Sequence, residues 1–383
     1  MPTWTVPLAD VVVPEEDITA VADVYRSGWL SLGPETEAFE GELAAYTGAR
    51  HALAVANCTV GLHLVCAAAG LGAGDEVILP SLTFVATANA VAYTGATPVF
   101  ADVAGLGAPW LSARAVEPLI GERTAAIMSM TYGGFAGETA ALRTLAAERG
   151  VPLLEDAAHG LGGSAGGRAL GTHGLAGGYS FFSNKNLAVG EGGAVVTDDD
   201  DLAGHMRLLR SHGMTTLTWD RHRGHASGYD VVALGFNYRI DEPRAALARA
   251  RLRRLDAENE QRAVLVRRYH EALAGVPGLA PALHAAPDER PAHHLFPVVL
   301  DAGIDRDAFR AELARAGVQT SMHYPPVHEF SIYADARRGR LAVTEDYAAR
   351  AVTLPLFAHM TREQQDLVVE AAAQAAGAAP SPR

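Results

Sequence analysis

The chain has 383 residues, of which 49% are hydrophobic and 20% charged, and its formal net charge is −13. This composition is typical of a globular protein and excludes a disordered one, and the length predicts two or three domains, or one large domain with an appendage. The acidic balance argues against general binding to nucleic acid, which requires basic surface to neutralise phosphates.

The ends of the chain and its cysteines suggest a cellular compartment. Residues 1–7 have no basic region, and no run of about 18 apolar residues occurs, so we expect neither export nor a membrane span. Cys58 and Cys66 lie in one expected strand-to-helix segment, too far apart in a helix to form a disulfide. These features predict reduced thiols and a cytoplasmic location. Residues 377–383 are small and proline-bearing, and we expect a disordered tail there.

The first half of the chain predicts an α/β domain. Residues 15–48 have the pattern of two amphipathic helices joined by a loop. Apolar strands and helices then alternate, with strands expected at 52–56, 76–80, 98–103, 125–130 and 151–156, and helices at 60–69, 83–93 and 138–149. This alternation predicts a mostly parallel sheet covered on both faces, with ligands at the carboxyl ends of its strands.

The second half changes in character. Residues 214–230 form a polar loop, a candidate lid or substrate-facing loop. Residues 241–273 predict one long helix between domains, followed by strands at 294–300 and 318–324 and helices at 305–316, 344–351 and 361–375. We therefore expect a large α/β domain in residues 1–240, and a linking helix with a smaller C-terminal α+β domain in residues 241–376.

Lys185 follows an expected strand, in the segment 180–187. Removing an ammonium group from water is expensive and lowers its pKa, which suits a lysine that forms a Schiff base. An ordinary surface lysine is an equally good interpretation of this residue alone, because lysines are mostly exposed.

Two segments predict a phosphate site. Asn57-Cys58-Thr59 precedes a helix, whose N-terminal amide groups favour an anion, and Ser180 could add a hydroxyl group. Thr59 could instead cap the helix. A nucleophilic role for Cys58 is less favoured than a structural one.

Three further residues suit a planar, positively charged ring. Phe84 begins a helix where an aromatic face could stack on the ring, although a core aromatic is the commoner interpretation. Asp156 ends a buried strand, and its carboxylate stays ionised only if a cation such as a protonated pyridine nitrogen faces it. His159 follows closely. A helix cap and a core histidine are the alternatives for these two residues. With the phosphate site and the amine, this set describes pyridoxal phosphate (PLP).

The order and spacing of these motifs resemble the DegT/DnrJ/EryC1/StrS family of PLP-dependent sugar aminotransferases over nearly the whole chain. The matching segments are residues 57–59, 74–78, 84–90, 155–159, 180–185, 190–193 and 237–239. The resemblance implies the α/β fold of aspartate aminotransferase (PLP fold type I), with a mostly parallel seven-stranded sheet and a smaller C-terminal α+β domain. It also implies a homodimer with shared active sites and PLP bound to Lys185.

The resemblance assigns roles by position. The phosphate would contact Cys58, Thr59 and Ser180, and the ring would contact Phe84, Asp156 and His159. Asn237 matches a position that reaches the phosphate in the neighbouring subunit. The substrate loop would include His323, Tyr324 and His328, although surface histidines are an equally good interpretation of His323 and His328. No metal site is expected.

The implied reaction transfers an amino group from L-glutamate to a nucleotide-linked keto-6-deoxy sugar, at C4 in preference to C3, in amino-sugar and antibiotic biosynthesis. Relatives that dehydrate sugars have histidine in place of the lysine, so Lys185 disfavours dehydration. A keto-cyclitol such as an inosose remains an alternative substrate. A non-catalytic regulator on the same fold is less favoured, because the lysine, the aspartate and the phosphate site are all present.

Overall fold

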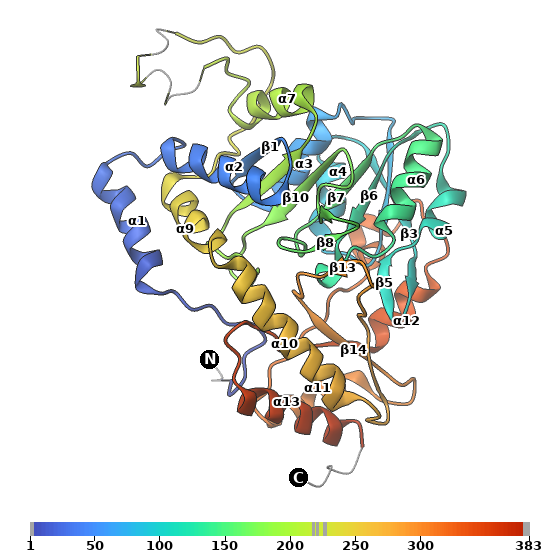
Figure 1. Cartoon of the computed structure of the whole chain (residues 1–383). Helices are drawn as coiled ribbons and strands as arrows, with labels where there is room; N and C mark the ends of the chain where they lie inside the picture. The colour runs from blue at the N-terminus through green and yellow to red at the C-terminus, as the bar shows by residue number, and fades with distance from the viewer. Residues whose placement is uncertain (1–3, 217–218, 220–221, 225–227, 378–383) are drawn as a thin grey trace.

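The computed structural model describes residues 4–377 except 217–218, 220–221 and 225–227. A seven-stranded sheet lies in the upper part of the molecule in Figure 1, and a smaller sheet with the C-terminal helices lies in the lower part. Helix α10 (Leu255–Leu273) runs from one part towards the other.

The large sheet confirms the predicted mostly parallel, seven-stranded architecture. Strand β11 is antiparallel to both of its neighbours, and the other adjacent pairs are parallel. In spatial order the strands are β1 (His51–Val55), β11 (Gly193–Thr197), β10 (Ala176–Ser180), β7 (Leu153–Asp156), β6 (Thr124–Met130), β2 (Glu76–Pro80) and β3 (Thr97–Ala101).

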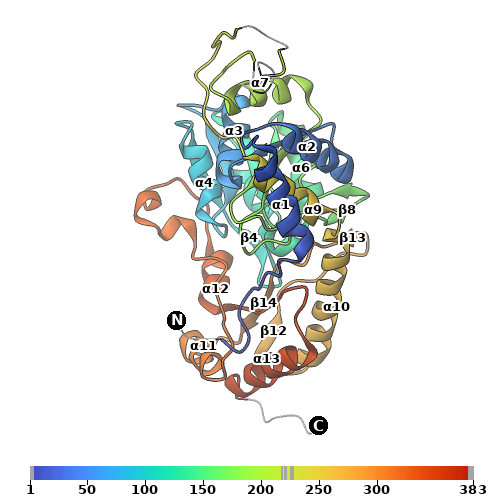
Figure 2. The same cartoon turned by 90° about the vertical axis from the view of Figure 1, so that its left-hand side faces the viewer.

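Helices cover both faces of this sheet because its strands are apolar on both sides. In β1, Leu53 and Val55 share a hydrophobic cluster with Leu64, whereas Ala54 faces the opposite side and packs with Phe39. One face is covered by α3 (Cys58–Ala68), α4 (Val85–Ala92) and α7 (Asp200–Arg210). The other is covered by α2 (Pro34–Thr47), α9 (Glu242–Leu252), α5 (Ala113–Val116) and α6 (Thr139–Arg149). Helix α1 (Glu15–Ser27) packs on α9, beside which it lies in both Figure 1 and Figure 2.

The C-terminal part has its own core and an antiparallel sheet. Its sheet contains β12 (Leu279–Pro281), β14 (Phe296–Leu300) and β15 (Ala351–Leu354), and its helices are α10, α11 (Arg306–Arg315), α12 (Ala342–Arg350) and α13 (Arg362–Ala375). The shorter elements are β4 (Val103–Gly105), β5 (Ala108–Leu111), β8 (Ser164–Ala165), β9 (Arg168–Ala169), β13 (Glu289–Arg290), η1 (Glu117–Leu119), η2 (Tyr132–Gly134), η3 (Val327–Glu329) and η4 (Ser331–Tyr333).

Two predicted elements differ from the structure. The single helix expected over 241–273 is broken between α9 and α10, where Arg251 and Arg254 both bind the buried carboxylate of Asp17. The strand expected over 318–324 is not formed. Isolated bridges join Val318 to Val6 and Ser321 to Thr353 instead, so this segment is held in place without a continuous ladder.

The loop expected to form a lid lies partly outside the described residues. Its Trp219 packs against Trp29 in the α1–α2 connection, with 4.7 Å between the ring centroids. In Figure 1 the described parts of this loop project beyond α7. The lid therefore stays a prediction.

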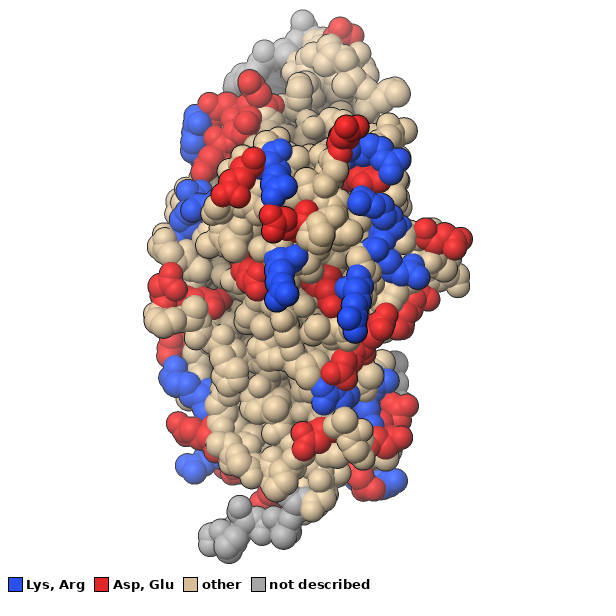
Figure 3. Space-filling view, turned by 90° about the vertical axis from the view of Figure 1, so that its right-hand side faces the viewer, with Lys and Arg blue, Asp and Glu red and all other residues tan. Residues whose placement is uncertain are grey.

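Surface charge is mixed on the face shown in Figure 3, where arginine and acidic side chains alternate among the described residues. None of the described helices is both long and apolar enough to cross a bilayer.

Candidate active site

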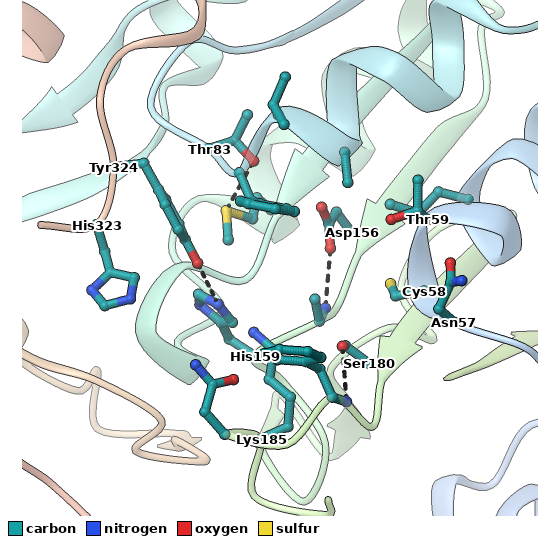
Figure 4. A pocket seen from close by; sticks show the side chains of 18 of the residues that line it. Asn57, Cys58, Thr59, Thr83, Asp156, His159, Ser180, Lys185, His323 and Tyr324 are labelled. Atoms are coloured by element: carbon teal, nitrogen blue, oxygen red, sulfur yellow. Dashed lines mark hydrogen bonds between the residues drawn. The ribbon is translucent and has the colours of Figure 1, made fainter. Parts of the chain in front are cut away.

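A cavity of about 760 Å³ opens at the carboxyl ends of the parallel strands. The strand register places Asp156 at this edge of the sheet, because Asp156 ends β7 and pairs with Met130 of β6 and Gly178 of β10. In Figure 4, Asn57, Cys58 and Thr59 lie on one side of the cavity and His323 and Tyr324 on the other. The predicted site residues that line it are Cys58, Thr59, Phe84, Asp156, His159, Ser180, Lys185, His323 and Tyr324.

Lys185 is the only lysine in the sequence. The buried Phe181 anchors the segment that carries it, and the Lys185 amide donates to the carbonyl of Phe182 at 2.9 Å. Burial lowers the pKa of Lys185 to about 8, although the charge of Asp156 opposes this shift. About one tenth of the amine is therefore neutral, and so nucleophilic, at pH 7, far more than for an ordinary lysine.

Asp156 offers an unpaired negative charge to the cavity. Its side chain is 2% exposed. Its carboxylate accepts hydrogen bonds from the Thr87 hydroxyl at 2.6 Å and from the Ala158 amide at 3.1 Å. Burial raises the pKa of Asp156, while these hydrogen bonds and Lys185 oppose the rise. A cation bound opposite the carboxylate would favour its ionised form. Our sequence interpretation missed Thr87, which orients this group.

The N-terminus of α3 forms an anion site. Asn57 caps the helix by accepting a hydrogen bond from the Val60 amide, and the first amides of a helix have no acceptor within it. Gly193 lets strand β11 pack directly against the start of α3, because a Cβ atom there would lie 2.6 Å from the Cys58 nitrogen. The hydroxyl of Ser180, the partner of Gly193 in the β10–β11 ladder, completes the site.

Cys58 contributes its backbone rather than a reactive thiolate. Burial, with the charge of Asp156, raises the pKa of the Cys58 thiol well above its ordinary value. Cys58 and Cys66 are both free and buried, as predicted for reduced cysteines.

His159 and Tyr324 both line the cavity and are hydrogen-bonded to each other. The Gly133 amide donates to His159 Nδ1 at 3.2 Å, and burial lowers the pKa of His159 well below its ordinary value. The neutral ring therefore carries its proton on Nε2, which donates to the Tyr324 hydroxyl oxygen at 2.9 Å. The Tyr324 proton is then available to an acceptor in the cavity. The ring of Phe84 lies 5.9 Å from that of Tyr324, at the same mouth.

A second network, also missed from sequence, holds Lys185 from behind. The Asn186 amide group donates to the Ala292 carbonyl at 2.7 Å, so its oxygen must face His294 Nδ1, 3.0 Å away. His294 therefore donates from Nδ1, and its Nε2 lone pair faces Lys185 Nζ at 3.4 Å. Asn259 supports Asn186 at 2.8 Å. This series of hydrogen bonds fixes the Nε2 atom of His294 as an acceptor beside the amine of Lys185.

The titration of Lys185 tests this environment. In cofactor-free enzyme, modification of residue 185 by trinitrobenzenesulfonate should be half-maximal near pH 8, instead of the ordinary 10.5, because burial disfavours the ammonium form. Peptide mapping separates this residue from the N-terminal amine. His294→Leu should move the midpoint lower, because the charged form loses its acceptor. A wild-type midpoint near 10.5 would contradict the buried environment.

The structure does not bring two predicted residues to this cavity. His328 is buried, and its Nδ1 is hydrogen-bonded to the Ser81 hydroxyl at 2.7 Å, so it holds the loop after β2. Asn237 is exposed and does not line the cavity of its own protomer. Its predicted role in a neighbouring subunit needs a second chain.

The residues present fit PLP. The α3 N-terminus and Ser180 suit its phosphate, Asp156 suits a protonated ring nitrogen, and Lys185 supplies the amine. The described residues contain no cluster of three or more metal-ligating side chains.

The sequence profile of the DegT/DnrJ/EryC1/StrS aminotransferase family matches residues 12–373. The chain belongs to this family. Membership confirms the predicted family, the enzyme class of PLP-dependent aminotransferases and PLP fold type I. The family implies PLP as the cofactor, in agreement with the fit of the cavity.

Three relatives align with this chain over almost its whole length. The spore coat polysaccharide biosynthesis protein SpsC of Bacillus subtilis (strain 168) is 37% identical over 369 residues, 94% of each chain. The crystal structure of S. venezuelae DesV is 38% identical over 94% of each chain, with a TM-score of 0.87. DesI, solved in the presence of its TDP-sugar product, is 32% identical over 98% of this chain and 93% of its own, with a TM-score of 0.88.

Proposed function

We propose that this aminotransferase transfers the amino group of L-glutamate to the keto group of a nucleotide-linked keto-6-deoxy sugar. The observation that carries the proposal is the convergence of Lys185, Asp156 and the α3 anion site on one large cavity. The similarity to DesI, whose crystal structure was analysed in the presence of its TDP-sugar product, supports a sugar nucleotide as substrate.

Each residue has a defined task in this reaction. PLP supplies an electrophilic carbon and an electron-withdrawing ring when it is bound. Asp156 keeps a proton on the ring nitrogen by charge, and α3 with Ser180 holds the phosphate. Lys185 would hold the cofactor through its amine, and its Nζ could carry a proton to or from the substrate carbon, for which a pKa of about 8 is suitable.

The cavity wall from the C-terminal part faces the sugar in this proposal. Tyr324 can donate its free proton to a sugar oxygen, because its hydroxyl oxygen is already occupied by His159. His323 lies beside it, with Nδ1 hydrogen-bonded to the Thr353 hydroxyl at 2.9 Å. The choice of C4 over C3 rests on the sequence resemblance alone.

A substrate panel tests the function. Purified enzyme with PLP and L-glutamate would be offered a nucleotide-linked 4-keto-6-deoxy sugar, its 3-keto isomer and a keto-inositol, with mass spectrometry of the products. We expect amination of the 4-keto sugar nucleotide. Exclusive amination of the keto-inositol would contradict the proposal and establish the cyclitol alternative.

The proposed homodimer places Asn237 against the phosphate of the neighbouring subunit. Asn237→Ala should weaken PLP binding by about 10- to 100-fold, because a hydrogen bond to a charged group is lost. PLP affinity would be measured by equilibrium dialysis, and turnover at saturating PLP would serve as the control.

Mixing subunits distinguishes a shared site from a separate one. At low PLP, Asn237→Ala and Lys185→Ala chains should each have little activity, and exchange of subunits should restore part of it, because one site per mixed dimer is then intact. No recovery in a mixture shown to contain mixed dimers would contradict the shared site.

A further inference from the structure

A second cavity, of about 270 Å³, lies next to the first, and Lys185 and Asn184 line both. Its walls include residues 9–12 from the N-terminal segment, residues 356–359 that follow β15, and the side of α10. The amide of Leu356 donates to the carbonyl of Leu8 at 3.2 Å, which joins two of these walls. A ligand here would lie beside the amine of Lys185.

Arg262 is the unusual residue of this cavity. Its side chain is 7% exposed, and its Nη1 is buried with no hydrogen-bond partner. Burial lowers the pKa of Arg262 to about 10, although the charge of Glu258 opposes this shift, and the guanidinium stays charged at neutral pH. A buried charge without a partner is costly, and such groups call for an ion or ligand that satisfies them.

The acidic side chains of the cavity already have other partners. Glu258 accepts a hydrogen bond from Arg254 Nε at 2.9 Å, and Asp10 lies 3.0 Å from His359 Nε2. Among the described residues, neither carboxylate forms an ion pair with Arg262.

The other arginine of the cavity is also satisfied. Arg251 is paired with Asp17 at 2.9 Å and donates to the Val12 carbonyl at 2.9 Å. Among the charged side chains that line this cavity in the described part of the chain, Arg262 is therefore the one with neither a hydrogen bond nor an ion pair.

We propose that this second cavity binds a carboxylate group of the amino-acid donor, with Arg262 as its partner. The inference rests on the proposed function, because it requires an amino-acid donor. A planar guanidinium group matches a carboxylate through two parallel hydrogen bonds, and Lys185, shared by both cavities, marks where the amino group is exchanged. The cofactor phosphate is expected at the N-terminus of α3, so the second cavity is available to the carboxylate group of the donor.

Binding of glutarate, a dicarboxylate without an amino group, tests the proposal without turnover. Titration calorimetry on the PLP-loaded enzyme should show saturable binding that L-glutamate competes for. Arg262→Gln should weaken it by about 10- to 100-fold, because a charge-assisted pair is lost. Arg267→Gln is the matched control, since Arg267 is exposed on the same helix and pairs with Glu260 at 3.4 Å. Equal glutarate affinity in wild type and Arg262→Gln would overturn the proposal.

Thermal unfolding separates ligand binding from a structural role. Arg262→Met should keep or raise the Tm of ligand-free enzyme, because it removes an unpaired buried charge and retains apolar volume. A lower Tm with unchanged glutarate affinity would show a structural arginine and overturn the proposal.

Single-turnover reactions separate this inference from the proposed function. Arg262→Gln should slow the reaction of L-glutamate with the loaded enzyme and spare the reverse reaction of the amino-sugar product. If Arg262→Gln slows the reactions of L-glutamate and L-glutamine equally, Arg262 binds the α-carboxylate. If it slows the reaction of L-glutamate alone, Arg262 binds the distal carboxylate. Both results support the inference. Equal slowing of donor and amino sugar would overturn it. Failure of wild-type enzyme to convert any keto-sugar nucleotide would reject the proposed function instead, and the glutarate result would stand by itself.

Discussion

Lys185→Ala is expected to abolish transamination and leave the fold intact. The loss should be on the order of 10⁴-fold or more, because proton transfer alone contributes about 10² to 10⁴ and the covalent attachment of the cofactor is lost as well. The fold should survive because the lysine makes one long contact, 3.4 Å to His294, and its burial opposes its charge. Turnover and thermal unfolding would be measured on the same preparation.

The unique lysine makes this result easy to interpret. No second lysine can replace Lys185 within the chain. Borohydride treatment of the wild-type holoenzyme should attach the cofactor to residue 185, and the variant should yield no labelled peptide there. Lys185→Arg is the matched control, because it keeps the positive charge without the nucleophile and should be equally inactive. Appreciable transamination by either variant would contradict the assignment.

Asp156→Asn is expected to lower turnover by about 10²- to 10³-fold, the usual effect of removing one electrostatic contact that the reaction requires. The amide has no charge to keep the ring nitrogen protonated. The variant should fold, because an amide of the same shape still accepts one of the hydrogen bonds from Thr87 and Ala158. Pre-steady-state rates with saturating PLP would separate slow chemistry from weak cofactor binding.

Thr87→Val provides the graded comparison. It removes the hydroxyl that orients Asp156 but keeps the carboxylate and a side chain of the same shape. We expect a smaller loss than in Asp156→Asn, with PLP still bound. Wild-type turnover in Asp156→Asn at saturating PLP would show that the carboxylate does not act on the ring.

Features with a local pattern were predictable from the sequence. An apolar run that ends in Asp156 and a cap followed by a helix at Asn57 each contain their own structural information. Once the alternation of strands and helices implies a parallel sheet, the carboxyl ends of the strands must meet at one edge. The positions of Asp156, Ser180 and the α3 N-terminus follow from that rule.

Features that depend on contacts distant in the sequence were not predictable. His294 reaches Lys185 across 109 positions, and no local pattern distinguishes it from the adjacent His293. The pairing of His328 with Ser81 spans 247 positions, so a histidine in the expected substrate loop points into the core. The break between α9 and α10 contains neither proline nor glycine, the residues that usually mark such a boundary.

A chain with 31 basic residues of which 30 are arginine has an uncommon chemical vulnerability. Reagents and metabolites that react with amines, such as cyanate or reducing sugars, would find no lysine side chain except Lys185, the residue that we propose binds the cofactor. Damage of this kind therefore cannot accumulate gradually over the surface of the protein. A molecule modified at Lys185 should be inactive, and a molecule unmodified there should keep its activity. Inactivation should therefore follow single-hit kinetics, and a bound cofactor should protect Lys185 from modification.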